Sequence, residues 1–263
     1  MTKIITSMQN TNIKQVASLL QKKQRKDQNA FLLEGFKCIQ AAVKSGFPVK
    51  QLFFEHAALS ELEGQLLIEL AKKQGTALFQ VPQSIINRLS DSKTPQPIVA
   101  VLEAFSCKLS EIQLPDNAIV LVLDGINDPG NLGTIIRTAD AFGIEGVILN
   151  QSCADIFSPK TLRATMGSLF HLPVIVNMPD QAIVTWLQAN SFQIAASAAD
   201  AQLTMQEANF SSRTALIMGS EAHGVSDYFF KQANFKVSIP MRGRAESLNV
   251  AIATALLLYS VRG

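Results

Sequence analysis

Three polar, glycine-containing segments follow short apolar runs in the second part of the chain. They are GINDPGNLGTIIRTADAFG (125–143), GSEAHGVS (219–226) and PMRGRAESLN (240–249). Their glycines let a ligand approach the backbone, and their Asn, Glu, Ser and Arg side chains can bind phosphate or hydroxyl groups. Because ligands of open parallel sheets bind beyond the carboxyl ends of the strands, such segments are candidates for a binding site.

The first segment opens with a turn, which Asp128, Pro129 and Gly130 predict. Asn131 is placed to begin a helix, and Arg137 lies on its second turn. This cation can hold a phosphate or fix a hydroxyl, or it is a solvated surface side chain. A nicotinamide- or nucleotide-binding α/β enzyme is one alternative for such a sequence. The glycine spacing argues against it, because it fits neither the G-x-G-x-x-G fingerprint nor a P-loop.

The other two segments add further polar groups at strand ends. Glu221 supplies a carboxylate, whereas a lone His223 is more often structural than catalytic. Ser247 fits the N-cap of the next helix, and capping alone would explain it. Asn249 opens an otherwise apolar helix, where a buried amide needs a hydrogen-bond partner.

Strands and helices alternate through this second part. The runs that predict strands are AIVLVLD, GVILN, LPVIVN, FQIAASA, TALIMG and FKVSIP. Helices are expected near residues 132–142, 180–189 and 247–259. Continuous apolar strands that alternate with helices are typical of a parallel sheet covered on both faces.

The first hundred residues predict a separate, mixed α/β part. Strands are expected at FLLEG (31–35), QLFFE (51–55), ALFQV (77–81) and IVAVLEAF (98–105), with helices at 13–21, 36–42 and 61–73. The polar segment 108–117 follows and contains a proline. We therefore predict two domains, 1–108 and 109–263.

The net charge of +2 conceals a division between these parts. Residues 1–108 hold 14 Lys/Arg and 8 Asp/Glu, a net charge of +6, whereas residues 109–263 hold 9 and 13, a net charge of −4. The basic cluster comprises Lys22, Lys23, Arg25 and Lys26. A basic part beside an acidic one suggests a polyanion-binding module, although chance segregation explains the counts equally well.

Composition and cysteine usage exclude several classes of protein. A hydrophobic fraction of 48% with 17% charged residues rules out intrinsic disorder. The polar first twenty residues lack a signal-peptide core, and the apolar stretch 250–259 is half the ~20 residues of a spanning helix. Three widely spaced cysteines and scattered histidines predict reduced thiols, no metal site and a cytoplasmic protein.

Taken together, the three segments resemble the three motifs of the SpoU (TrmH-like) RNA 2′-O-ribose methyltransferase family, within the SPOUT superfamily. Motif one resembles Asn127–Gly143, with a core of Asn131, Gly133 and Arg137; motif two resembles Gly219, Glu221, Gly224 and Val225; motif three resembles Ile239–Gly243 and Glu246–Val250. The stretch 158–174 is similar to the region between motifs. More loosely, the first part resembles the RNA-binding domain that these enzymes often carry.

The resemblance implies an α/β fold that has a C-terminal Rossmann-like parallel sheet with a deep trefoil knot. A smaller α/β, ribosomal-protein-like RNA-binding domain would precede it, and the chain would form a homodimer. The implied reaction is S-adenosylmethionine (AdoMet)-dependent methylation of a ribose 2′-hydroxyl in structured RNA, with ribosomal RNA favoured and transfer RNA as the alternative. An RNA-binding protein with an inactive methyltransferase domain is a further alternative, which intact Arg137, Glu221 and Asn249 argue against.

The resemblance also implies roles for individual residues. The catalytic set would be Arg137, Asn131, Glu221, Ser247 and Asn249. The cofactor-binding set would be Gly219, Ile239, Met241 and Leu248, and the RNA-binding set Lys22, Lys23, Arg25 and Lys26. An arginine is a poor base because its pKa lies far above neutral pH, so we expect Arg137 to position a ribose or phosphate while a phosphate takes the proton. Glu221 would orient Arg137 or Asn131.

Overall fold

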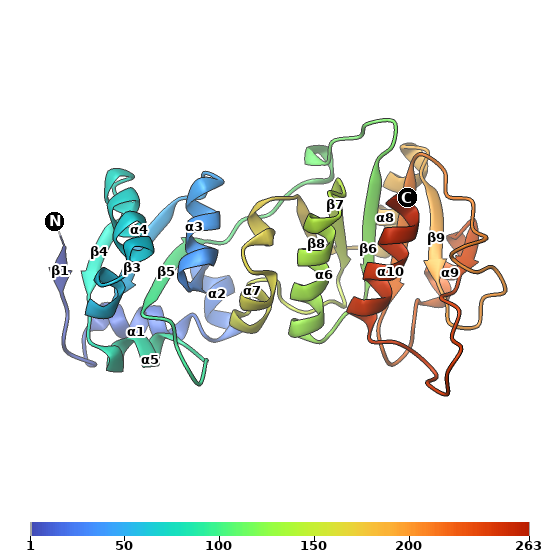
Figure 1. The fold of residues 1–263 in the computed structure, drawn as a ribbon. Coiled ribbons are helices and arrows are strands. Elements are labelled where there is room, and N and C mark those ends of the chain that lie inside the picture. The colour runs from blue at the N-terminus through green and yellow to red at the C-terminus, as the bar shows by residue number, and fades with distance from the viewer. Residues whose placement is uncertain (1, 263) are drawn as a thin grey trace. The chain divides into compact units, whose positions relative to one another are not determined.

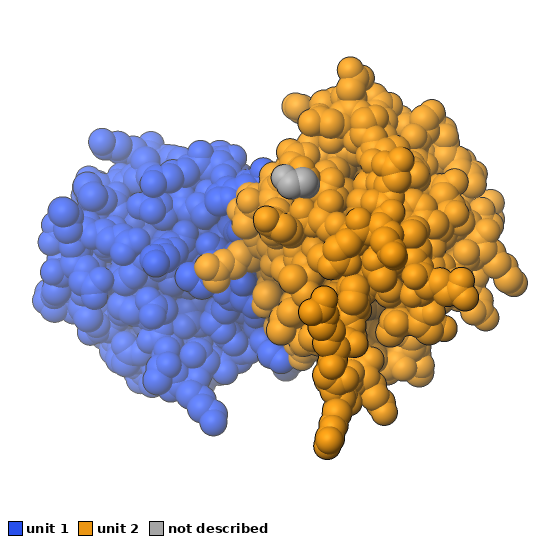
Figure 2. Space-filling model, turned by 45° about the vertical axis from the view of Figure 1, so that its right-hand side comes forward, with its two compact units in different colours: residues 1–105, 155–171 blue, residues 106–154, 172–263 orange. Residues whose placement is uncertain are grey.

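The computed structural model describes residues 2–262 as two compact units, drawn in two colours in Figure 2. The first comprises residues up to 105 together with 155–171, and the second comprises 106–154 and the residues from 172 on. The first unit has a net charge of +6 and the second −4, so the charge division follows the units. A single cut at Lys108 does not describe this division, because residues 155–171 pack within the first unit.

The second unit is an α/β fold built on a six-stranded sheet. All pairs of neighbouring strands in this sheet, among the described residues, are parallel, as the sequence predicts. The strand order is β11-β9-β10-β6-β7-β8. The strands are β6 (Ile119–Asp124), β7 (Gly146–Asn150), β8 (Val174–Met178), β9 (Gln193–Ser197), β10 (Thr214–Gly219) and β11 (Phe235–Val237). The central strands β6 and β10 are buried along their whole length, which explains their continuous apolar sequences.

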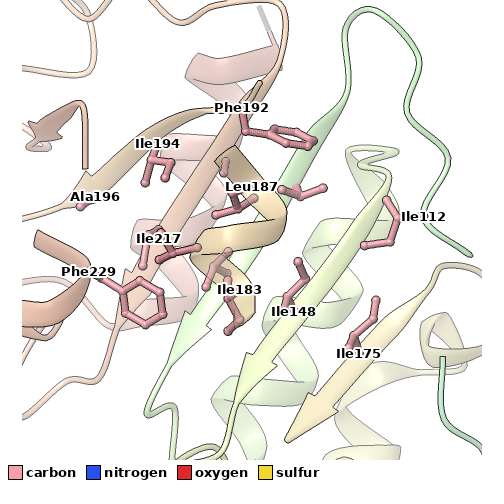
Figure 3. Close-up of a cluster of buried hydrophobic side chains, with 14 of the residues drawn as sticks. Ile112, Ile148, Ile175, Ile183, Leu187, Phe192, Ile194, Ala196, Ile217 and Phe229 are labelled. Atoms are coloured by element: carbon pink, nitrogen blue, oxygen red, sulfur yellow. The ribbon is translucent and has the colours of Figure 1, made fainter. Parts of the chain in front are cut away.

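Helices cover this sheet (Figure 1). They are α6 (Pro129–Ala141), α8 (Asp180–Ala189), α9 (Asp227–Gln232) and α10 (Val250–Arg262). On one face, Ile148 and Ile217 of the sheet pack with Ile183 of α8 and Phe229 of α9, as Figure 3 shows. Helices α6 and α10 pack against each other, and α10 also contacts β10.

The first unit is a mixed α/β fold. Its sheet has the order β1-β4-β3-β5-β2, from β1 (Lys3–Ile4), β2 (Ala30–Glu34), β3 (Val49–Phe54), β4 (Ala77–Gln80) and β5 (Ile98–Glu103). Its helices are α1 (Thr11–Ser18), α2 (Lys22–Gln28), α3 (Phe36–Lys44), α4 (Leu62–Lys73), α5 (Gln83–Leu89) and α7 (Pro159–Thr165). Within residues 2–262, every helix is too short or too polar to cross a lipid bilayer.

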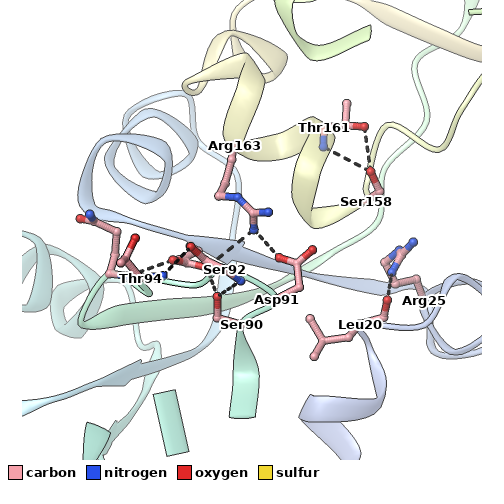
Figure 4. Close-up of polar contacts among 11 residues, drawn as sticks. Leu20, Arg25, Ser90, Asp91, Ser92, Thr94, Ser158, Thr161 and Arg163 are labelled. Atoms are coloured by element: carbon pink, nitrogen blue, oxygen red, sulfur yellow. Dashed lines mark hydrogen bonds and ion pairs between the residues drawn. The ribbon is translucent and has the colours of Figure 1, made fainter. Parts of the chain in front are cut away.

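Residues 155–171 belong to this unit because both aromatic and charged side chains hold them there. Phe157 stacks on Phe31, with ring centroids 4.6 Å apart, and Phe170 packs edge-on against Phe47. The Arg25 guanidinium donates to Asp155 Oδ2 at 2.7 Å. Arg163 of α7 likewise forms an ion pair with Asp91 (Figure 4).

The placement of Arg25 argues against its predicted role in RNA binding. Its side chain is buried, with 6% of the residue exposed, and it donates to the carbonyl oxygens of Leu19 and Leu20 as well as to Asp155. A buried charge must be paired in this way to be tolerated. Lys22, Lys23 and Lys26 are exposed on the same helix. The basic surface therefore consists of these three lysines, and Arg25 is structural.

Candidate active site

A cavity of 340 Å³ lies at the carboxyl ends of β9, β10 and β11. It is lined by residues from the segments that follow these strands and by the start of α10. The four residues expected to bind a cofactor are all in this lining: Gly219, Ile239, Met241 and Leu248. Glu221 and Ser247 of the expected catalytic set line it too. The structure thus brings together these six residues of the last two motifs, which are up to 29 positions apart in the sequence.

A chain of hydrogen bonds joins all three motifs. Asn131 Nδ2 donates to Glu221 Oε1, and Asn249 Nδ2 donates to Asn131 Oδ1 at 3.0 Å. Asn249 Oδ1 in turn accepts from the backbone nitrogen of Ala251 at 3.0 Å. The Asn131 amide therefore uses its donor and its acceptor at the same time, which fixes its orientation between the two other motifs.

The caps of two helices place these amides. Helix α6 begins at Pro129, earlier than the expected 132, because the Asp128 side chain accepts from the Asn131 backbone nitrogen at 2.9 Å and proline suits the first helical position. Helix α10 begins at Val250, and its cap is Asn249. The capping interpretation of Ser247 is therefore wrong, since that residue lies two positions before the cap and faces the cavity.

Glycine is required where the segment after β10 folds back on the strand. A Cβ on Gly219 would lie 1.9 Å from the carbonyl carbon of Gly224, so no larger residue fits without moving the backbone. Gly224 has φ +64° and donates its backbone hydrogen to the Ser220 carbonyl at 2.8 Å. This tight turn presents Glu221 and His223 at the cavity.

Asp124 and Asn150 are the last residues of the apolar strands β6 and β7. They were not singled out from the sequence, although a polar residue at the end of an apolar strand was a signal for them. Asp124, only 7% exposed, accepts from Asn150 Nδ2 and from the Ser226 backbone nitrogen, both at 2.7 Å. Asn150 also accepts from the Gly125 backbone nitrogen at 3.1 Å. These bonds satisfy a buried carboxylate and tie the segments after β6, β7 and β10 to one another. Asp124 and Asn150 are positioning residues.

Arg137 lies apart from the hydrogen-bonded chain. It is exposed and is not in the cavity lining, and it makes no hydrogen bond or ion pair with any of residues 2–262. Six residues of helix carry it about 9 Å along the axis and about 120° around it from Asn131. Of the two partners that the resemblance implies for Glu221, Asn131 and not Arg137 is the one that it binds.

Thiolate chemistry does not fit this site. Cys153, beside the carboxyl end of β7, has a pKa raised to about 11 by burial, so its thiol stays protonated at neutral pH. All three cysteines are free, as the sequence predicts. Among the residues that the structure describes, no group of three His, Cys, Asp or Glu side chains is arranged to hold a metal ion.

Comparison with known proteins identifies relatives over the whole chain. Residues 118–259 match the SpoU rRNA Methylase family, and residues 10–100 match the MRM3-like substrate binding domain. The chain is 36% identical to the 23S rRNA (guanosine(2553)-2′-O)-methyltransferase of Bacillus subtilis over 99% of this chain and all of that protein. It is 30% identical to the 23S rRNA (uridine(2479)-2′-O)-methyltransferase of Streptomyces viridochromogenes, over 87% of this chain and 81% of that one.

A solved structure is similar at the level of the fold. The AdoMet-bound rRNA methyltransferase from Sinorhizobium meliloti superposes with a TM-score of 0.90 at 32% identity, covering 99% of this chain and 97% of that one. These relatives confirm the resemblance carried by the three motifs.

Gly219→Ala tests the close approach at the cavity. We expect the new methyl group to displace the 219–225 turn and to lower the free energy of unfolding by about 2 kcal/mol or more, a typical cost of backbone strain and overpacking. Chemical denaturation measures the loss. Gly243→Ala is the matched control, because its Cβ meets nothing within 4 Å. Equal stability of the two variants would contradict this account of Gly219.

Proposed function

This chain belongs to the SpoU rRNA methylase family, and we propose that it transfers a methyl group from AdoMet to the 2′-hydroxyl of a ribose in ribosomal RNA. The observation that carries the proposal is the hydrogen-bonded chain from Glu221 through Asn131 to Asn249, which joins the three motifs beside the 340 Å³ cavity. The rRNA 2′-O-methyltransferases among its relatives support this substrate class. Such a substrate would place the enzyme in the cytoplasm.

The proposal extends to the division of labour along the chain. Residues 1–108 form the RNA substrate-binding domain, and residues 109–263 the methyltransferase domain, with 155–171 adding to the fold of the first. The match of residues 10–100 to a substrate-binding family supports this division. Family membership also supports a ribosomal-protein-like fold for the first domain and a deep trefoil knot in the second.

The cavity suits AdoMet in size and in charge. A volume of 340 Å³ falls within the usual range for small-molecule sites, about 300–1,000 Å³. Asp200, Glu221 and Glu246 line it, and its lining contains no lysine or arginine, which complements a cationic sulfonium. The backbone at Gly219, Ile239 and Leu248, with the Met241 side chain, would hold the cofactor. When bound, AdoMet supplies a methyl carbon activated by its positively charged sulfur.

The protein must then orient a weakly acidic ribose hydroxyl and provide for its proton. Asn131, fixed by Glu221 and Asn249, presents an amide to the nucleotide, and Ser247 adds a hydroxyl at the cavity. Arg137 positions the ribose or its phosphate. A phosphate oxygen of the RNA takes the 2′-proton, because a guanidinium group is a poor base.

Arg137→Ala tests this role. We expect methyl transfer to unmodified ribosomal RNA, measured with methyl-labelled AdoMet, to fall by about 100-fold or more. AdoMet affinity, measured by calorimetry, should not change, because Arg137 lies outside the cavity lining. Lys231→Ala, which removes another exposed cation of the same unit, is the control. Near-full activity of the Arg137 variant would overturn the role, and wild-type protein that neither binds AdoMet nor methylates RNA would overturn the function.

The basic surface on α2 gives a second test. Charge reversal of Lys22, Lys23 and Lys26 should weaken RNA binding and reduce the slope of log K against log salt by up to about three. Arg25→Ala should instead leave that slope unchanged and lower the free energy of unfolding by about 3 kcal/mol, because it removes the cation that pairs with the Asp155 carboxylate. If the triple variant binds RNA with the affinity of the wild type, the prediction is wrong and the three lysines form only a solvated helix face.

We further propose that the protein is a homodimer joined through α10. Ile252, Leu256 and Tyr259 are 54%, 37% and 66% exposed, and their spacing of four and three residues puts them in one stripe along the helix. Apolar side chains gathered in this way mark an interaction surface. Light scattering should give twice the chain mass, and Leu256→Asp with Tyr259→Asp should halve it. A wild-type mass of one chain would contradict the dimer.

A further inference from the structure

An electrostatic problem arises at the cavity. The unit that contains it has a net charge of −4, and the cavity lining holds Asp200, Glu221 and Glu246 but no lysine or arginine. RNA is a polyanion, and its phosphates must come close to this cavity if a ribose is to be methylated there. The carboxylates of the cavity repel these phosphates, so nearby cations must offset the repulsion.

The arginines of this unit fall into two groups. Arg213 and Arg262 are structural: Arg213 donates to the Asn190 and Leu114 carbonyls, and Arg262 donates to the Gly143 carbonyl and pairs with Glu145 at 3.7 Å. The others are Arg137, Arg242 and Arg244, and each is exposed and makes no hydrogen bond or ion pair with another described residue. The unpaired guanidinium groups therefore belong to the first and third motifs.

The position of Arg242 and Arg244 separates them from the cofactor. They lie in the irregular segment between β11 and α10, which extends beyond the end of the sheet (Figure 1). Met241 on one side and Glu246 on the other line the cavity, whereas Arg242 and Arg244 do not. Their guanidinium groups thus lie outside the cavity, on the segment that borders it.

We propose that Arg242 and Arg244 bind the phosphodiester backbone of the RNA next to the target ribose. The inference rests on the proposed function. Guanidinium forks match phosphate oxygens in bidentate geometry, and two residues separated by one lie at most about 7 Å apart along the backbone, so they can reach neighbouring phosphates. A Cβ added at Gly243, between them, would meet nothing within 4 Å, so the space beside this part of the segment is open.

The same chemistry would also recognise the carboxylate of AdoMet, so the experiment must separate the two anions. The double variant Arg242→Ala/Arg244→Ala is compared with wild type and with Lys231→Ala, each checked by thermal unfolding. RNA affinity is measured by filter binding at several salt concentrations, AdoMet affinity by calorimetry, and kcat and KM for RNA by methyl transfer.

We expect the double variant to raise KM for RNA about tenfold or more and to reduce the salt slope by about two, with AdoMet affinity unchanged. Arg242→Lys/Arg244→Lys should restore the salt slope, because lysine keeps the charge. Unaltered RNA affinity and slope would overturn the proposal, as would weaker AdoMet binding with RNA binding unaltered. Failure of wild-type protein to bind AdoMet would instead contradict the proposed function, and the RNA-binding comparison would still decide the role of the arginines.

Discussion

Two hydrogen bonds of the Asn131 side-chain amide connect the three motifs, and the geometry of the site depends on them. The amide donates to Glu221 and accepts from Asn249, residues that lie 90 and 118 positions further along the chain. Both bonds form only if α6, the turn after β10 and the start of α10 meet at one end of the sheet. Four local features position these segments: the helix caps at Asp128 and Asn249, the tight turn at Gly219, and the buried Asp124 carboxylate.

This arrangement explains why the acidic unit can carry out chemistry on RNA. Carboxylates line a cavity suited to a cationic cofactor, while the described arginines that make no ion pair in this unit belong to the first and third motifs and lie outside the cavity lining. The first unit, with its net charge of +6, would provide the longer-range attraction for a polyanion in the proposed function. The proposals thus assign attraction of the RNA, local phosphate binding and cofactor binding to different residues.

Much of this could be predicted from the sequence because it depends on local pattern. The continuous apolar runs predicted a parallel sheet, and the polar segments after them predicted where a ligand would bind. Three features could not be predicted in this way. The sequence places Arg25 in a basic cluster, but its role depends on the ion pair with Asp155, which lies 130 residues away in the chain. The cap of α10 is Asn249 instead of Ser247, because the same amide must also reach Asn131. Residues 155–171 pack within the first unit through aromatic contacts that leave no periodic signal.

The central claim is that the methyl group goes to a ribose oxygen of ribosomal RNA. A methylated 2′-oxygen cannot attack the adjacent phosphodiester, so that linkage resists alkali. Unmodified ribosomal RNA is incubated with the protein and methyl-labelled AdoMet, then hydrolysed in alkali and separated by size. If the methyl group is on the ribose, the label is expected in an alkali-resistant dinucleotide. Label recovered on a base in mononucleotides, or no transfer at all, would contradict it.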